Sequence, residues 1–490
     1  MASLPKPELS SLQDPRHLVP PLISAQPTAR VSGRPRLPFG FGPRFFMVLL
    51  VGLVWLGPAW WEPRFLYAML LWDLLALAAW AVDLARLPRP EQIEVRRIWH
   101  APAALGTPSR VQLEIVNRGR VAALCVAVDD VPGVLRAEPP VVEIRAGAGN
   151  SGRGEYSIAP RERGDARLGR LYLRYQSPLR LAERWASADL AQAVRIYPNL
   201  EEAKRQTVYL IRSRQVELEK RLKRQRGRGR EFESLREYRQ GDEWRDICWT
   251  ATARCNHLVT KVYQVERSQV VWLVIDAGRL LRARVLGLSK LDYAVNAALS
   301  LAHVALYSGD RVGLFAYGRR PQQRLAAGRG SAHLRALVEQ LALVRGEPSE
   351  ADHIRAAETL LATQKRRSLI VWLTDLAETP ATPEVIEGAL QMTRRHLVLF
   401  GVISQPDLRE LAARIPETER EMYHHMAAEE MIQRRELLLG RLRQKGALAV
   451  EFDPTVYPEA QSEGLPRAQS KGLSTALVNH YLDIKERSLL

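Results

Sequence analysis

The stretch that decides the fold is VVWLVIDAG, Val270–Gly278. This apolar run rich in β-branched residues predicts a buried strand. A helix is predicted at Lys290–Tyr307 and a strand at Arg311–Tyr317, and a second buried run, SLIVWLTDL, follows at 368–376. Strands that alternate with amphipathic helices predict an α/β fold over residues 269–490, with a mainly parallel sheet covered by helices on both faces.

The rest of this region continues the alternation. Helices are predicted at 333–343, 351–363, 383–395, 417–445 and 473–487, and strands at 396–403 and 447–452. Right-handed crossovers bring the carboxyl ends of parallel strands to one edge, where open α/β sheets bind ligands. The last helix has apolar residues at helical spacing and is expected to pack back on the domain.

Asp276 and Asp375 end the two buried runs, and this half of the chain resembles von Willebrand factor A-type domains. Those domains hold a divalent metal through D-x-S-x-S, a later threonine and a late aspartate. The resemblance assigns Asp276 and Asp375 to the two aspartates and Ser331 to the threonine, as ligands for Mg²⁺, which prefers oxygen. Gly278 and Leu280 replace the two serines, so the site is incomplete.

The alternative for the two aspartates is structural. In that reading they accept hydrogen bonds from loop amides or pair with Arg279 or Arg282. No cofactor is then required.

Upstream lies a second informative stretch, GREFESLREYRQGDEWRDICWTATAR, residues 229–254. It mixes arginines, acids and aromatics, which predicts arginine–carboxylate forks packed on rings. We expect a helical turn at Glu231–Tyr238, a turn at Gly241-Asp242 and a short helix beginning near Trp244. The residues favour a structural clasp or docking surface over a catalytic site.

This stretch resembles the signature of the bacterial family catalogued as domain of unknown function 58. The matching residues are Gly229, Glu231, Phe232, Leu235, Arg236, Tyr238, Gly241, Asp242, Arg245, Ile247, Trp249, Ala253 and Arg254. The resemblance implies an association with MoxR-type AAA+ ATPases in the assembly or maturation of other complexes. We therefore expect a docking surface made by Glu231, Phe232, Arg236, Tyr238, Gly241, Asp242, Arg245, Trp249 and Arg254.

The chain of 490 residues carries a formal charge of +17, which is typical of proteins that bind nucleic acid or anionic membranes. Apolar runs at 45–61 and 65–85 favour the lipid bilayer, because each is near the ~20 residues that cross it. Only Glu62-Pro63-Arg64 joins them, so they predict a transmembrane helical hairpin over 45–85. Asp73, within the second run, suggests hydrogen bonding inside the hairpin or in a homo-oligomer.

Arginines flank the hairpin on both sides, at Arg30, Arg34, Arg36, Arg44, Arg86, Arg89, Arg96 and Arg97. By the positive-inside rule both termini lie in the cytoplasm, so we expect a two-pass protein of the bacterial cytoplasmic (inner) membrane. Three cysteines, Cys125, Cys248 and Cys255, are too few for a disulfide framework and fit a reducing compartment.

The remaining regions differ from one another in composition and in hydrophobic pattern. Residues 1–40 lack apolar periodicity and predict a disordered tail, whereas short alternating runs in 91–198 predict an antiparallel β-sandwich. Residues 199–268 form a basic linker and the signature. The basic run Lys220–Arg230 could bind lipid or nucleic acid, but it lacks the aromatics of a single-strand platform, so nucleic acid is disfavoured.

We therefore predict a membrane-anchored scaffold or adaptor that binds a partner protein and is not an enzyme. Two alternatives stay open. One is a lipid- or nucleic-acid-binding regulatory module built on the basic run. The other is a hydrolase that uses Asp242, Asp246, Cys248, Cys255 or His257, for which no orienting motif is visible.

Overall fold

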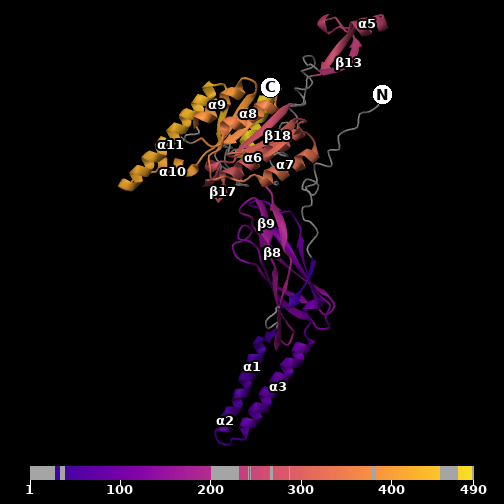
Figure 1. Ribbon diagram of the computed structural model, residues 1–490, viewed down its shortest axis with the longest axis vertical. Coiled ribbons are helices and arrows are strands. Elements are labelled where there is room, and N and C mark those ends of the chain that lie inside the picture. Colours follow the sequence, from indigo (N-terminus) through magenta and orange to yellow (C-terminus); the bar gives the residue numbers. More distant parts are fainter. Residues whose placement is uncertain are drawn as a thin grey trace, which may run out of the picture. The chain divides into compact units, whose positions relative to one another are not determined.

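The computed structural model divides the described residues into two compact units, one within residues 28–197 and the other within residues 198–487. It describes residues 28–33, 39–199, 231–240, 242, 244–264, 269–285, 287–376, 382–452 and 473–487. Figure 1 shows the elements of both units, which are described separately below.

The first unit contains two antiparallel sheets that share one core. One sheet has the order β1-β4-β5-β8, with β1 at Thr28–Arg30, β4 at Ile93–Trp99, β5 at Ser109–Asn117 and β8 at Ser151–Ile158. The other has the order β2-β11-β10-β6-β7, with β2 at Ser32–Gly33, β11 at Ala182–Ala188, β10 at Leu171–Gln176, β6 at Ala123–Asp129 and β7 at Val141–Ala146. Strands β9 (Gly164–Leu168) and β12 (Gln192–Ile196) pair with each other. Apolar side chains from both sheets form a single buried cluster, so the predicted sandwich is present.

The sandwich begins earlier than the sequence suggested. Strand β1 pairs with β4, while β2 and β3 (Phe39–Phe41) pair with β11. The prediction of a disordered tail over residues 1–40 is therefore wrong for these segments. Short strands of two or three residues carry almost no periodic signal, and backbone pairing to an existing sheet edge decides their conformation.

The helical hairpin lies between β3 and β4 in the chain. It comprises α1 (Pro43–Gly52), the 3₁₀ turn η3 (Leu53–Trp55), α2 (Leu56–Ala59) and α3 (Phe65–Arg86). α1 and α3 lie side by side (Figure 1). They approach closely at Gly52, where an added Cβ would lie 2.6 Å from Trp72 Cδ1 and 3.2 Å from Asp73 Oδ1.

Helix α3 is the one helix of the described chain that is both long and apolar enough to cross a membrane, with 22 residues and a mean hydropathy of 1.9. Its leucines face outward rather than into a core, since Leu70 and Leu74 are 62% and 63% exposed. Helices α1 and α2 form a shorter apolar run over Pro43–Ala59.

Both ends of the hairpin bond to one loop of the sandwich. The amide of Gly42, just before α1, donates to the carbonyl of Leu181 at 2.7 Å. Asp83, near the end of α3, is buried and its Oδ2 accepts from Ser177 Oγ at 2.8 Å and from the amides of Leu181 at 3.2 Å and Ala182 at 3.0 Å. The 3₁₀ turn η4 (Pro90–Gln92) then leads into β4.

The second unit is built on a six-stranded sheet with the order β19-β18-β15-β20-β21-β22. The strands are β15 at Val270–Asp276, β18 at Arg311–Tyr317, β19 at Pro321–Gly328, β20 at Leu369–Thr374, β21 at Leu397–Ile403 and β22 at Leu448–Phe452. All pairs are parallel except β18 with β19. The mainly parallel sheet is as predicted, and the antiparallel edge strand β19 was missed.

Helices cover both faces of this sheet. They are α6 (Lys290–Tyr307), α7 (Ser331–Leu343), α8 (His353–Thr363), α9 (Thr382–Thr393), α10 (Pro406–Ala413), α11 (Glu419–Gln444) and α12 (Leu473–Glu486). Side chains of α8, α9 and α11 pack on Trp272, Trp372 and Phe400 in one core. On the other side α6 contacts β15 and β18, and α7 and α12 pack on α6. The long helix α11 runs beside α10 (Figure 1).

The 3₁₀ turn η6 (Arg279–Arg282) and the short hairpin of β16 (Arg284–Val285) and β17 (Leu288–Ser289) precede α6. Helix α12 is fixed by polar contacts as well, because Tyr481 Oη donates to Asp310 and Lys485 Nζ lies 2.8 Å from Asp310 Oδ2.

The signature stretch forms a β-hairpin whose two strands are joined by two short helical segments. Strand β13 (Glu231–Glu237) pairs antiparallel with β14 (Val259–Gln264), and the 3₁₀ turn η5 (Trp244–Asp246) and α5 (Trp249–Cys255) lie between them. The helical turn predicted at Glu231–Tyr238 is wrong, because pairing with β14 overrides local propensity. The basic run Lys220–Arg230 lies outside the described residues, as does Gly241.

Candidate functional site

The turn of the signature hairpin is held by one arginine–aspartate pair. Arg236 NH2 lies 2.5 Å from Asp242 Oδ1, and the amide of Arg239 donates to Asp242 Oδ2 at 2.9 Å. The Arg236 guanidinium and the Arg239 amide lower the pKa of the Asp242 carboxyl. The structure thus contains an arginine–carboxylate pair that closes the turn, joined through one nitrogen and one oxygen rather than as the predicted fork, since Arg236 NH1 donates to the carbonyl of Glu237 instead.

Other signature residues point outward. Trp244 and Trp249 are 68% and 63% exposed, and Arg245 and Arg254 are exposed as well. Neither arginine has an ion-pair partner among the residues that the structure describes. Tyr238 is half-buried, with its ring centroid 6.1 Å from that of Trp244, while Ile247 is buried and forms a backbone bridge with Thr260 of β14. For Glu231 and Phe232 the structure gives the backbone, as part of β13.

The cysteines and the histidine of this module are not arranged as a nucleophile and base. His257 Nδ1 lies 2.8 Å from the carbonyl oxygen of Cys255, and His257 Nε2 lies 3.7 Å from Glu237 Oε1. Cys248 Sγ lies 3.4 Å from Thr250 Oγ1. Hydrogen bonds from the Thr250 hydroxyl and the Ala251 amide lower the pKa of the Cys248 thiol. The contacts of His257 are therefore to a carbonyl and a carboxylate.

The second candidate site is the carboxyl edge of the parallel sheet, where Asp276 is buried. Its Oδ1 accepts from the amide of Gly278 at 2.7 Å, and its Oδ2 accepts from Thr374 Oγ1 at 2.7 Å. Burial raises the pKa of Asp276 despite these hydrogen bonds and the nearby His353. The loop-amide role considered for this residue is confirmed.

Asp375 is buried beside it and is bound by two cations. Lys290 Nζ lies 2.7 Å from Asp375 Oδ2, and Arg435 NH2 lies 2.9 Å from Asp375 Oδ1. The side chains of Lys290 and Asp375 are 1% and 5% exposed. The expected pairing of the aspartates with Arg279 or Arg282 is wrong for Arg279, which bonds to Glu350 at 2.8 Å.

Ser331 does not join the two aspartates. In the sheet Asp276 aligns with Tyr317 at the end of β18, whereas Gly328, shortly before Ser331, pairs with Val312 near its start. The five steps from Val312 to Tyr317 correspond to roughly 16 Å along the strand. Ser331 is therefore at the opposite edge, because the missed strand β19 reverses the chain direction.

The residues at this edge do not fit a magnesium ion. Mg²⁺ needs near-octahedral oxygen ligands, and each carboxylate oxygen of Asp276 and Asp375 already has a donor. A serine at position 278 would also be crowded, since a Cβ there would lie 2.9 Å from the Ala351 amide nitrogen. Within the described residues no group of three His, Cys, Asp or Glu side chains is placed to hold a metal.

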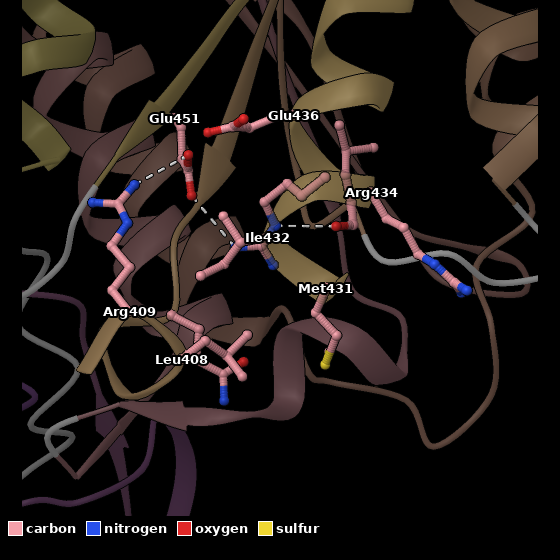
Figure 2. Close-up of a pocket in the computed structure, with 10 residues that line it drawn as sticks. Leu408, Arg409, Met431, Ile432, Arg434, Glu436 and Glu451 are labelled. Carbon is pink, nitrogen blue, oxygen red and sulfur yellow. Dashed lines mark hydrogen bonds and ion pairs between the residues drawn. The ribbon is translucent and has the colours of Figure 1, made fainter. Parts of the chain in front are cut away.

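A pocket of about 150 Å³ adjoins this edge (Figure 2). Its lining comes from α10, α11 and the strand ends, and includes Leu408, Arg409, Met431, Ile432, Arg435 and Glu451. Glu451 bonds to Arg409 at 3.2 Å and to Arg435 at 3.4 Å. Glu451 is thus paired with two of the three arginines that line the pocket.

Sequence reasoning missed Lys290 and Arg435. Lys290 was placed at the start of a helix, where a lysine ordinarily lies in solvent, and Arg435 belongs to a helix rich in charge. The sequence did contain one signal. Apart from Asp292, Asn296, Ser300 and His303, residues 291–305 of α6 are apolar or aromatic, which predicts that the start of this helix is buried.

Comparison with known proteins gives a family match at the signature. The model described as "Protein of unknown function DUF58" matches residues 234–426. This confirms the resemblance seen in the signature, whose residues from Leu235 to Arg254 lie within the match.

Uncharacterized proteins of Mycobacterium tuberculosis and Mycobacterium bovis are 27% identical over 151 residues, which is 30% of this chain and 48% of theirs. The chain therefore spans about half the length of the curated relatives it matches.

Among solved structures, the chain is similar to the conserved hypothetical protein BatB from Bacteroides thetaiotaomicron. The two are 12% identical, the match covers 46% of this chain and 100% of that chain, and the TM-score is 0.29. The chain is also similar to an aerotolerance-related membrane protein from Bacteroides fragilis. The two are 10% identical, the match covers 45% of this chain and 100% of that chain, and the TM-score is 0.28.

Proposed function

We propose that this chain is a membrane-anchored adaptor that binds a partner protein through the outward side of its signature hairpin. The observation that carries the proposal is that Trp244, Trp249, Arg245 and Arg254 are all exposed in one short stretch of the signature. Tryptophan and arginine are the residue types that contribute most to the free energy of binding at protein interfaces. Arg245, Trp249 and Arg254 belong to the docking surface expected from the signature, and Trp244 is added to it here.

The charge of the hairpin supports a protein as the partner rather than nucleic acid. Residues 231–264 carry six acids and five bases, counting Asp and Glu against Lys and Arg. Phosphate binding depends on an excess of cations. A near-neutral surface with two exposed indole rings instead suits a protein surface that offers apolar pockets and a few carboxylates.

The hairpin of α1 to α3 is the proposed anchor in the bacterial cytoplasmic membrane. A core helix of a soluble protein buries its leucines, whereas Leu70 and Leu74 are 62% and 63% exposed on α3. Gly42 and Asp83, at the two ends of the hairpin, both bond to Leu181. This supports a two-pass arrangement with both ends on one side, which the flanking arginines assign to the cytoplasm.

The second unit is proposed to be a von Willebrand factor A-like domain. Its mainly parallel sheet and the helices on both faces support this assignment. The proposed partner is a MoxR-type AAA+ ATPase, as the DUF58 resemblance implies, and the proposed role is non-catalytic.

The test is binding of the detergent-solubilised full chain to a purified MoxR-type ATPase from the same organism. The double variant Trp249→Ala/Arg254→Ala is expected to weaken binding roughly tenfold or more. The matched control is Tyr172→Ala/Arg174→Ala, an exposed aromatic and arginine on β10, which should leave affinity unchanged. Equal affinities for the wild type and the signature variant would refute the docking surface, and no binding by the wild type would refute the proposed partner.

A further inference from the structure

The carboxyl edge of the α/β sheet contains a positive charge that belongs to the protein itself. Lys290 opens α6, and its side chain is buried to 1% exposure, which is rare for a lysine. Its ammonium lies 2.7 Å from Asp375 Oδ2 and 3.4 Å from Gln405 Oε1. These two oxygens follow the adjacent strands β20 and β21, so the ammonium is held by two strand ends.

The other oxygen of Asp375 is bound by Arg435 from α11. This guanidinium also contacts the carbonyl of Leu376 at 3.2 Å and Glu451 at 3.4 Å, and its side chain is 11% exposed. Asp375 therefore binds α6 through Lys290 and α11 through Arg435. These two helices pack on opposite faces of the sheet, so one carboxylate ties both helix layers to the strand ends.

A divalent cation and this arrangement are mutually exclusive. A metal at Asp375 would have to displace a buried ammonium, which would then be left without a counter-charge at high cost in free energy. Arginine stays protonated at every accessible pH, so Arg435 cannot give up its oxygen by titration.

We propose that Lys290, together with Arg435, is a built-in replacement for a divalent cation at the carboxyl edge of this domain. The ammonium neutralises Asp375 and positions the ends of β20 and β21, which is the structural work that a bound metal would do there. The domain then keeps its strand-end geometry in the presence of chelators. Lys290, Asp375 and Arg435 lie outside the signature hairpin, so a metal ion bound at Asp375 would leave the proposed docking surface intact.

The first test uses the full wild-type chain in detergent with Mn²⁺ as the probe, followed by electron paramagnetic resonance. No saturable binding is expected up to millimolar Mn²⁺, and the melting temperature should be the same in chelator and in Mg²⁺. One saturable site per chain that Asp375→Asn abolishes would overturn the proposal. This measurement does not depend on the folding of any Lys290 variant.

The second test compares Lys290→Met, Asp375→Leu and the double variant. Lys290→Met leaves Asp375 with Arg435 as its one remaining cation, and Asp375→Leu leaves the buried Lys290 without its counter-charge, so the melting temperature should fall by about 6 °C or more in each. The double variant should recover most of that loss. Arg279→Met is the control, since it breaks the exposed pair with Glu350 in the neighbouring loop and should shift the melting temperature little. A Lys290→Met protein as stable as the wild type would also overturn the proposal.

Discussion

Arg97 and Asp129 form a two-pronged ion pair in the middle of the β-sandwich, with Arg97 Nε 3.0 Å from Asp129 Oδ2 and Arg97 NH2 2.5 Å from Asp129 Oδ1. Neither side chain has any solvent exposure. β4 and β6 belong to different sheets, so the pair joins the two. Tyr156 Oη donates to Asp129 at 2.7 Å, and Arg97 NH1 donates to the carbonyl of Leu190 at 2.7 Å.

Replacing Arg97 with methionine should destabilise the sandwich by about 3–5 kcal/mol, because Asp129 would remain buried without a counter-charge. The free energy of unfolding in denaturant measures this loss. The double variant Arg97→Met/Asp129→Leu should recover much of it. If the double variant were as unstable as the sum of both single changes, the pair would owe its effect to packing rather than charge.

Asp83 should hold the helical hairpin to the sandwich. Asp83→Ala removes the acceptor for the Ser177 hydroxyl and for the amides of Leu181 and Ala182. Unsatisfied buried donors cost about 1–3 kcal/mol each, so a loss of roughly 2 kcal/mol or more is expected. Limited proteolysis should cleave the loop 177–182 faster in this variant. The matched control is Glu62→Ala, an exposed acid in the turn before α3.

The sequence was sufficient for the α/β sheet because burial and periodicity agree there. The helix predicted at Lys290–Tyr307 and the strand predicted at Arg311–Tyr317 match α6 and β18 in their bounds. Most apolar residues of these two elements are buried, so the local pattern and the tertiary packing favour the same structure.

Prediction from the sequence failed where the strands or side chains that contact each other lie far apart in the chain. Strands β1 to β3 are too short for a periodic signal and depend on β4 and β11. Strand β19 was not predicted. It runs antiparallel to β18, so Ser331 lies at the opposite edge of the sheet from Asp276 and Asp375, with which the resemblance had grouped it as a metal ligand. Lys290 was missed because its partner Asp375 is 85 residues away in the sequence.

The raised pKa of Asp276 predicts a pH dependence of stability. Because burial favours the protonated carboxyl, the folded state binds this proton more tightly than the unfolded chain does. The contribution of Asp276 protonation to the stability of the fold is fully present below the ordinary aspartate pKa. It is lost as the pH rises through the raised pKa of the folded state.

The variant Asp276→Asn stays uncharged and can still accept from Gly278. Its stability relative to the wild type should therefore increase from acidic to neutral pH, as measured by urea unfolding midpoints across a pH series. Glu350→Gln, a partly exposed acid nearby, serves as the control. A difference between Asp276→Asn and the wild type that does not change with pH would contradict the assignment.

A charge placed in the middle of α3 tests whether this helix lies in lipid. Leu74 is 63% exposed and near the centre of the 22-residue helix. Arginine at the centre of a membrane helix costs about 2.5–3.5 kcal/mol of insertion free energy. Leu74→Arg should therefore reduce the membrane-integrated fraction, measured as resistance to alkaline carbonate extraction. Leu66→Arg, near the start of α3, should have a smaller effect, because a terminal arginine can extend to the headgroups. If α3 were exposed to water instead, both arginines would raise solubility and neither would change the extracted fraction.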